Sequence, residues 1–174
     1  MFDLLIKNAE IFDGTGSEPY IADLAVLDGK IAAIGRDLAP AETVVDAQGR
    51  ALSPGFIDCH SHADNWITDY PDRTHVLRMG VTTEIAGNCG NTQFPVNRGI
   101  GDLDGGEYFS SLNAFYDRLG QQDLGPNLAV FAGHGNLRRL AMGIENRKAG
   151  EKEVAIMRES LRQSLEEGAL GYTT

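Results

Sequence analysis

PGFIDCHSHADN, residues 54–65, is the most informative stretch of this sequence. Its apolar run GFID is typical of a short buried strand, and two histidines on either side of a serine follow at once. Because side chains alternate along a strand, His60 and His62 would point to one side and Cys59 to the other. Two imidazoles directed at one volume are a natural pair of ligands for a divalent metal. Two surface histidines in a loop are the alternative, and Cys59 is interpreted as a small packing residue.

The residues before this stretch predict a small β module over residues 1–53. DLLIKNAEIF (3–12) is apolar enough for a strand. IADLAVLDGKIAAIG (21–35) predicts two strands joined at Asp28-Gly29, a strong hairpin signal. A further short strand-like run, ETVVDAQGRAL (42–52), ends shortly before Pro54.

The residues after it, 54–174, alternate between strand-like and helix-like segments. Further strands are predicted in MGVTTEIAGN (79–88), NLAVFAG (127–133) and GALGYTT (168–174). The helices are predicted over residues 107–120 and 151–168, each ending at a glycine. Their apolar faces are Tyr108, Leu112, Phe115 and Leu119 in the first, and Val154, Met157, Leu161 and Leu165 in the second. Such alternation predicts βα repeats with a parallel sheet, and the long loop 91–107 after the second strand is expected to frame a site.

Cys89 lies in AGNCGN, between glycines at the C-terminal end of the second predicted strand. Glycines allow the backbone and a bound ion to approach closely. A thiolate is a strong zinc ligand, and coordination removes its proton. A small buried residue is the structural alternative. Because the preceding strand ends at His60 and His62, we predict that Cys89 is a third metal ligand.

Composition and charge argue against several classes of protein. The chain is 42% hydrophobic and 23% charged, which is typical of a globular protein. Its net charge of −10 argues against nucleic-acid binding, which favours a basic surface. It has no apolar run long enough for a membrane helix, and MFDLLIKN at the N-terminus lacks the features of a signal peptide. We therefore predict a cytoplasmic protein without nucleic-acid or membrane partners, in which Cys59 and Cys89 are reduced.

In four segments the chain resembles the amidohydrolase superfamily: DLLIKNAEIFDGTG, VLDGKIAAIG, VVDAQGRALSPGFIDCHSH and GVTTEIAGNCG. Within it, GNCG, AGHGNLR (132–138) and GALGYTT are similar to the N-acyl-D-amino-acid deacylases, or D-aminoacylases. The resemblance covers nearly the whole chain. It implies an α/β fold, with the first half of the (β/α)8 TIM barrel of a metal-dependent hydrolase over 54–174. Part of a small β-sandwich domain would precede it over 1–53.

The resemblance also implies a metal site. His60 and His62 match the metal ligands of the first barrel strand, and Cys89 matches a thiolate ligand that can bridge two metal positions. The implied cofactor is zinc, as one or two divalent ions.

Three further residues are candidates for substrate binding. Asp64 matches the acidic residue that commonly follows the two histidines, and a solvated loop carboxylate is its alternative. His134 and Arg138 match a motif of the third strand near the substrate pocket. They could orient the acyl or carboxylate group of a substrate, or serve in the core or in a salt bridge.

The implied reaction is hydrolysis of the amide bond of an N-acyl-D-amino acid to a carboxylate and a free D-amino acid. Zinc would activate a water and polarise the carbonyl, and a carboxylate would act as general base. In the family that base is an Asp expected beyond residue 174, so no residue here is assigned a catalytic role. Because a barrel takes about 250 residues, we expect the first part of a longer enzyme, inactive alone. Its partners would be the substrate and the remainder of the same polypeptide or a complementary chain.

Two other functions compete with this one. A dihydroorotase-like or hydantoinase-like cyclic amidase, or a dipeptidase of the same superfamily, would share the N-terminal motifs. These enzymes are expected to use a carboxylated lysine as bridging ligand, whereas GNCG supplies a cysteine. A non-catalytic metal-binding or structural module is the third possibility.

Overall fold

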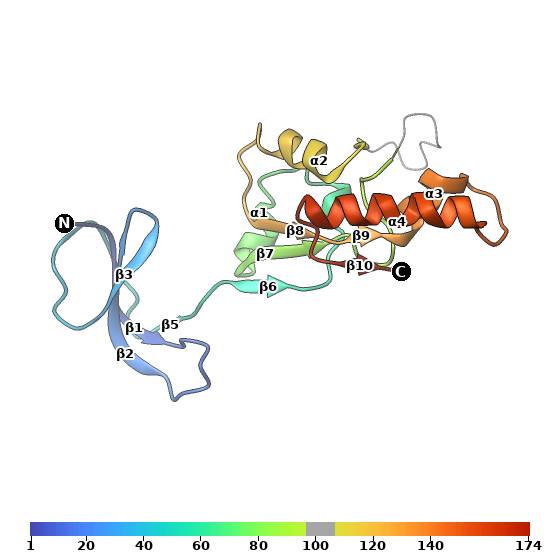
Figure 1. Ribbon diagram of the computed structural model, residues 1–174. Coiled ribbons are helices and arrows are strands. Elements are labelled where there is room, and N and C mark those ends of the chain that lie inside the picture. The colour runs from blue at the N-terminus through green and yellow to red at the C-terminus, as the bar shows by residue number, and fades with distance from the viewer. Residues whose placement is uncertain (97–106) are drawn as a thin grey trace. The chain divides into compact units, whose positions relative to one another are not determined.

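The structure of this protein is a computed structural model that describes residues 1–96 and 107–174 (Figure 1). The chain forms two compact units, Met1–Pro54 and Gly55–Thr174, and each is described by itself. The central part of the loop predicted over 91–107 lies outside the described residues.

The first unit is one five-stranded sheet. Its strands are β1 (Phe2–Ile11), β2 (Tyr20–Leu27), β3 (Lys30–Gly35), β4 (Ala41–Asp46) and β5 (Ala51–Leu52). The order is β3-β2-β1-β4, and β5 also pairs with β1. β1, β2 and β3 pair antiparallel, whereas β4 and β5 run parallel to β1.

The predicted hairpin at Asp28-Gly29 is confirmed. Asp28 (φ 52°) and Gly29 (φ 70°) are the two residues between β2 and β3, and both have the positive φ that a tight two-residue hairpin favours. The run over 42–52 forms two strands instead of one. A turn at Gln48 (φ 54°) and Gly49 (φ 77°) separates β4 from β5.

Apolar side chains of β1 and β2 are buried together around Ala9, Ile11 and Ala22. Other apolar side chains of this sheet remain exposed, such as Ile31 on β3 (64%) and Val44 on β4 (55%). A β-sandwich needs a second layer, and residues 1–54 form one sheet only. The β-sandwich therefore stays a prediction.

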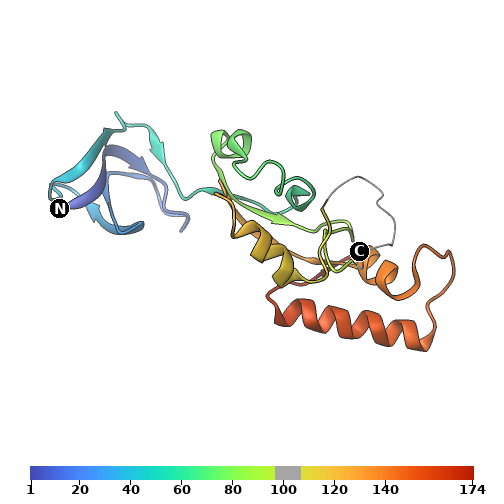
Figure 2. The ribbon, with the colours of Figure 1, turned by 90° about the horizontal axis from the view of Figure 1, so that it is seen from above.

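The second unit is built on parallel strands that lie side by side in chain order (Figures 1 and 2). They are β6 (Phe56–Asp58), β7 (Val81–Ala86), β8 (Asn127–Val130), β9 (Ala132–Gly133) and β10 (Tyr172–Thr173). β6, β7 and β8 form one parallel sheet, and β9 pairs with β10 in parallel. Only Phe131 separates β8 from β9, so the four predicted strands are adjacent and parallel, as the first strands of a (β/α)8 barrel would be.

Helices connect these strands. They are the 3-10 turn η1 (Ala63–Asn65) and the α-helices α1 (Thr74–Arg78), α2 (Leu112–Leu119), α3 (His134–Met142) and α4 (Glu151–Glu166). The main core contains Ala86 and Val130 of the strands and Leu112 and Phe115 of α2, and Leu161 of α4 packs against it. The strands therefore have a helical layer over the core (Figure 2).

The helix predicted over 107–120 is confirmed, although it is shorter. It begins at Leu112 because the Ser111 hydroxyl accepts a hydrogen bond from the Ala114 N–H at 3.2 Å, as an N-cap does. Its predicted apolar residues Leu112, Phe115 and Leu119 are buried.

The second predicted helix, α4, exists, and its predicted apolar face is half right, because Met157 and Leu161 are half-buried. Val154 is 41% exposed and Leu165 is 44% exposed, whereas Ser164 is 3% exposed. The inward stripe of the helix therefore includes Leu161, which packs against the core, and the small Ser164. Helix α3 was not predicted, because its start at Gly133 has no capping side chain.

β6 was predicted to be a buried strand, and that prediction is wrong for this chain. Phe56 is 61% exposed and Ile57 is 58% exposed. Within the described residues β6 pairs only with β7, so it is an edge strand here. Among those residues no helix is both long and apolar enough to cross a membrane.

Candidate metal centre

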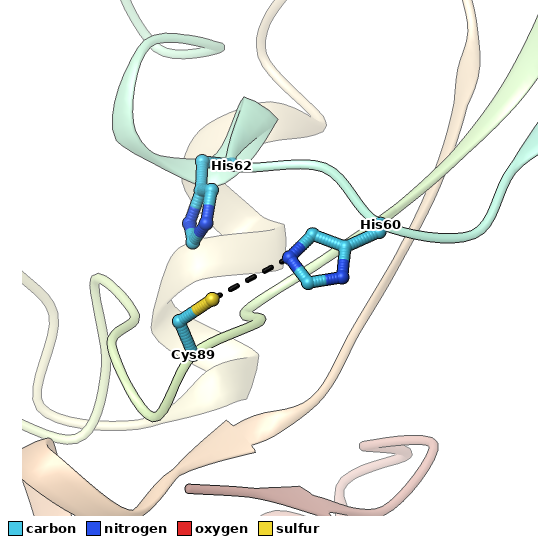
Figure 3. Close-up of side chains that lie close together, drawn as sticks. All are labelled: His60, His62 and Cys89. Atoms are coloured by element: carbon cyan, nitrogen blue, oxygen red, sulfur yellow. Dashed lines mark hydrogen bonds between the residues drawn. The ribbon is translucent and has the colours of Figure 1, made fainter.

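Two histidines and a cysteine meet beyond the carboxyl ends of β6 and β7 (Figure 3). The ligand atoms of His60, His62 and Cys89 lie within 4.8 Å of one another, and all three residues are exposed. Cys89 Sγ is 3.4 Å from His60 Nε2, and the two imidazole rings lie edge to face with centroids 5.9 Å apart. At usual zinc–ligand bond lengths, two ligands of a tetrahedral ion are about 3.5 Å apart. The cluster therefore fits side chains that share a divalent metal.

A turn brings the histidines together, so the explanation from strand alternation was wrong. β6 ends at Asp58, before either histidine. Asp58 Oδ1 accepts a hydrogen bond from the His60 N–H at 3.1 Å, and the Ser61 N–H donates to a backbone carbonyl of β7 at 3.0 Å. His62 then stands at the start of η1. Cys59, predicted to be a packing residue, is exposed because it lies in this turn outside the strand.

A buried ion pair supports this turn, and the sequence reasoning missed it. Arg73 donates two hydrogen bonds to Glu84 of β7, from Nη2 at 2.7 Å and from Nε at 3.0 Å. The Glu84 side chain is only 1% exposed. The Ser61 hydroxyl donates to Glu84 at 2.9 Å and accepts the Ala63 N–H at 2.9 Å. These bonds connect Ser61, the residue between the two histidines, to β7. Glu84, an acidic residue inside the strand segment VTTEIA, was the sequence feature that could have indicated this buried contact.

Cys89 lies on a loop that is otherwise buried and is joined to the histidine turn. Its backbone is left-handed, with φ 57°. The neighbouring Asn88 is buried, and its amide donates to the Ser61 carbonyl at 3.2 Å. The two loops that carry the three candidate ligands are therefore bonded to each other.

Asp64 is fully buried, so the alternative interpretation, a solvated loop carboxylate, is wrong. Its Oδ1 accepts the Gly87 N–H at 3.3 Å, and its Oδ2 has no hydrogen-bond partner among the described residues. Burial raises the pKa of Asp64 to about 6, although the Gly87 N–H and the nearby His62 act to lower it. Asp64 lies between the histidine turn and the cysteine loop, and substrate binding by it stays a prediction.

His134 and Arg138 are both on α3, and they have different partners. His134 is the first residue of the helix, and its Nδ1 is hydrogen-bonded to the Tyr172 hydroxyl of β10. Arg138 donates to the backbone carbonyls of Glu145 and Arg147 in the loop before α4. These contacts place His134 at the carboxyl end of β9, whereas Arg138 supports a helix connection. A substrate contact by either residue stays a prediction.

Known proteins share this sequence and this fold. Residues 43–174 match the model of the amidohydrolase family. The chain is 37% identical to the D-aminoacylase of Alcaligenes xylosoxydans xylosoxydans over an alignment of 182 positions, which covers 99% of this chain and 37% of that protein. Its structure is similar to that of N-acyl-D-glutamate deacylase from Bordetella bronchiseptica, complexed with zinc and a phosphonate inhibitor that mimics the tetrahedral intermediate. For that structure the TM-score is 0.93 and the identity 36%, over 99% of this chain and 38% of the other.

A second solved structure, of a D-aminoacylase with a binuclear metal centre, is also similar. Its TM-score is 0.92 and its identity 31%, over 100% of this chain and 38% of the other. The chain thus spans less than two fifths of the length of each of these relatives. The predicted α/β fold is confirmed by these matches, which cover almost every residue. The family match also includes His60, His62 and Cys89, and the chain belongs to the amidohydrolase family.

Proposed function

We propose that the complete protein is a zinc-dependent hydrolase of N-acyl-D-amino acids that releases a carboxylate and a free D-amino acid. The clustering of His60, His62 and Cys89 within 4.8 Å is the observation that carries this proposal. Membership of the amidohydrolase family supports the reaction class. The named relatives, a D-aminoacylase and an N-acyl-D-glutamate deacylase, support the substrate class.

The donor set suits zinc. Imidazole nitrogen and thiolate sulfur are ligands that zinc prefers in proteins. His60 and His62 would bind as neutral imidazoles and Cys89 as a thiolate, for one ion or for two that share the sulfur. Bound zinc would polarise a substrate carbonyl and lower the pKa of a coordinated water. The protein's part is to hold these three ligands in place through the turn after β6 and the loop after β7.

Among the candidate substrate contacts, we retain His134. It stands at the carboxyl end of β9, where substrates bind in such sheets, and its bond to Tyr172 orients the ring. The bonds of Arg138 to two loop carbonyls support the alternative role of holding the structure together. The full burial of Asp64 supports a role inside the fold for its carboxylate instead of a contact with substrate.

We also propose the domain assignment predicted from the sequence. Residues 1–53 would be part of a β-sandwich domain, and residues 54–174 would be the first βα units of the barrel. The general base and further metal ligands would come from the remainder of the same polypeptide or from a complementary chain. The exposed strand β6 is consistent with a further barrel strand at its free edge.

The test uses the complete protein and a matched pair of cysteine variants. Purified wild type is assayed on N-acetyl-D-amino acids and N-acetyl-L-amino acids, and the zinc content of Cys89→Ala and Cys59→Ala is measured. We expect hydrolysis of the D series, loss of zinc and activity in Cys89→Ala, and little change in Cys59→Ala, since both cysteines are exposed but only Cys89 lies in the cluster. Hydrolysis of the L series alone would refute the substrate class. Unchanged zinc in Cys89→Ala would refute the ligand assignment.

A cytoplasmic location is part of the proposal. Both cysteines are free thiols, and a reducing compartment would keep Cys89 available as a ligand. Cell fractionation with detection of the protein tests this location.

A further inference from the structure

The loop that carries Cys89 is held by side chains from two elements much later in the chain, α3 and β10. Gly87, Asn88, Gly90 and Thr92 of this loop are buried, whereas Cys89 is exposed. From these two elements, the side chains of Asn136 and Thr173 bond to the backbone of the loop. Both residues belong to motifs, AGHGNLR and GALGYTT, for which the proposed function gives these two positions no role.

Asn136 holds the end of the loop. It is 0% exposed, and its side-chain amide makes two hydrogen bonds to one residue. Its Oδ1 accepts the Thr92 N–H at 2.9 Å, and its Nδ2 donates to the Thr92 carbonyl at 2.7 Å. An amide side chain supplies this combination of donor and acceptor, whereas a carboxylate supplies only acceptors.

Thr173 holds the loop on both sides of Cys89. Its hydroxyl donates to the Gly87 carbonyl at 2.5 Å and accepts the Gly90 N–H at 3.3 Å. One hydroxyl therefore connects the residue two positions before the cysteine to the residue directly after it. Figure 1 shows that β10, which contains Thr173, is the last strand of the chain.

The conformation of Cys89 gives these contacts their importance. Cys89 has a left-handed backbone with φ 57°, which residues other than glycine adopt only when their surroundings hold them there. The Gly135 N–H adds a further bond to the Gly90 carbonyl at 2.7 Å. The sulfur thus points toward the histidines because α3 and β10 hold the backbone on each side of it.

We propose that Asn136 and Thr173 are positioning residues that set the place of the Cys89 thiolate before metal binds. The proposal rests on the proposed function, because it assumes that Cys89 is a metal ligand. Neither residue is among the three candidate metal ligands. They act through the backbone of residues 87–92, and they link the later motifs AGHGNLR and GALGYTT to the metal centre.

The test measures cobalt binding to the complete protein after its own metal has been removed. Thiolate-bound cobalt(II) has a charge-transfer absorption that reports the cobalt–sulfur bond. Thr173→Val keeps the side-chain shape and removes the hydroxyl. We expect its cobalt and zinc affinities to fall about 10-fold or more, the range measured for residues that orient metal ligands, with a weaker charge-transfer band. Thr173→Ser, which keeps the hydroxyl, should restore both the affinity and the band.

Asn136→Asp provides a second variant if Thr173→Val does not fold. It keeps an acceptor for the Thr92 N–H and loses the donor, so the same direction of change is expected. Thr68→Val is the matched control, because Thr68 is also buried but holds no part of the cysteine loop. It should bind cobalt as the wild type does.

Two results would overturn the proposal. If Thr173→Val and Asn136→Asp only lower the unfolding temperature, with affinity and band unchanged, then the residues are merely structural. If the wild type itself shows no thiolate–cobalt band, the proposed function of Cys89 fails, and the positioning role fails with it.

Discussion

Replacing Arg73 by methionine should destabilise the protein more than any comparable change of a surface arginine. Arg73 makes two hydrogen bonds to Glu84, at 2.7 and 3.0 Å, and the two side chains are 11% and 1% exposed. Methionine fills similar space but leaves the Glu84 carboxylate buried, with the Ser61 hydroxyl as its remaining side-chain partner. Removing one member of a buried pair costs about 3–5 kcal/mol. Because Arg73 is partly exposed, we expect the lower end, about 3 kcal/mol.

The assay is denaturant unfolding of the complete protein, with the free energy taken from the midpoint and slope. Arg118→Met is the control, because the Arg118–Glu107 pair has a single contact of 3.1 Å and side chains 31% and 47% exposed. Such a pair contributes at most about 1 kcal/mol.

A double variant, Arg73→Met with Glu84→Gln, separates the ion pair from simple loss of packing. Glutamine removes the buried charge, so the double variant should lose only about 1–3 kcal/mol, the cost of an unsatisfied buried polar group. The reasoning is refuted if Arg73→Met costs no more than Arg118→Met, or if the double variant is less stable than Arg73→Met alone.

Two further predictions concern backbone strain and pH. Gly87→Ala should lower the unfolding temperature more than Gly14→Ala does. Both glycines have positive φ (77° and 79°), so the backbone strain of the two variants is similar. A Cβ at Gly87 would lie 2.5 Å from the Phe131 carbonyl oxygen, whereas a Cβ at Gly14 would meet no atom of the described residues. Equal losses would contradict this steric explanation. The hydrogen bonds that Glu153 accepts, first of all from Arg147, lower its pKa to about 2. Its stabilising contribution should therefore be complete above its unfolded pKa of about 4.3 and be lost as the pH falls through about 2; an NMR titration midpoint of the Glu153 carboxylate near 4 would contradict this prediction.

Local patterns were sufficient where the chemistry is local. Asp28-Gly29 predicted its hairpin because few residue pairs tolerate positive φ at both positions. The apolar spacing of Leu112, Phe115 and Leu119 predicted the buried face of α2. The order of strand and helix segments predicted parallel strands, which brings residues that follow successive strands to one edge of the sheet. For this reason the sequence alone was enough to group Cys89 with His60 and His62.

What the tertiary structure decided is how these side chains are held. The histidines converge because a turn bonded to β7 holds them, and not because they alternate along one strand, as the sequence pattern had suggested. Neither the partner of Glu84 nor the loop held by Asn136 and Thr173 could be predicted, because residues distant in the chain meet only when the strands adopt their register. Hydrophobic patterns identify which segments pack, but hydrogen bonds between buried polar groups depend on positions accurate to a fraction of an ångström, and only the folded chain determines those positions.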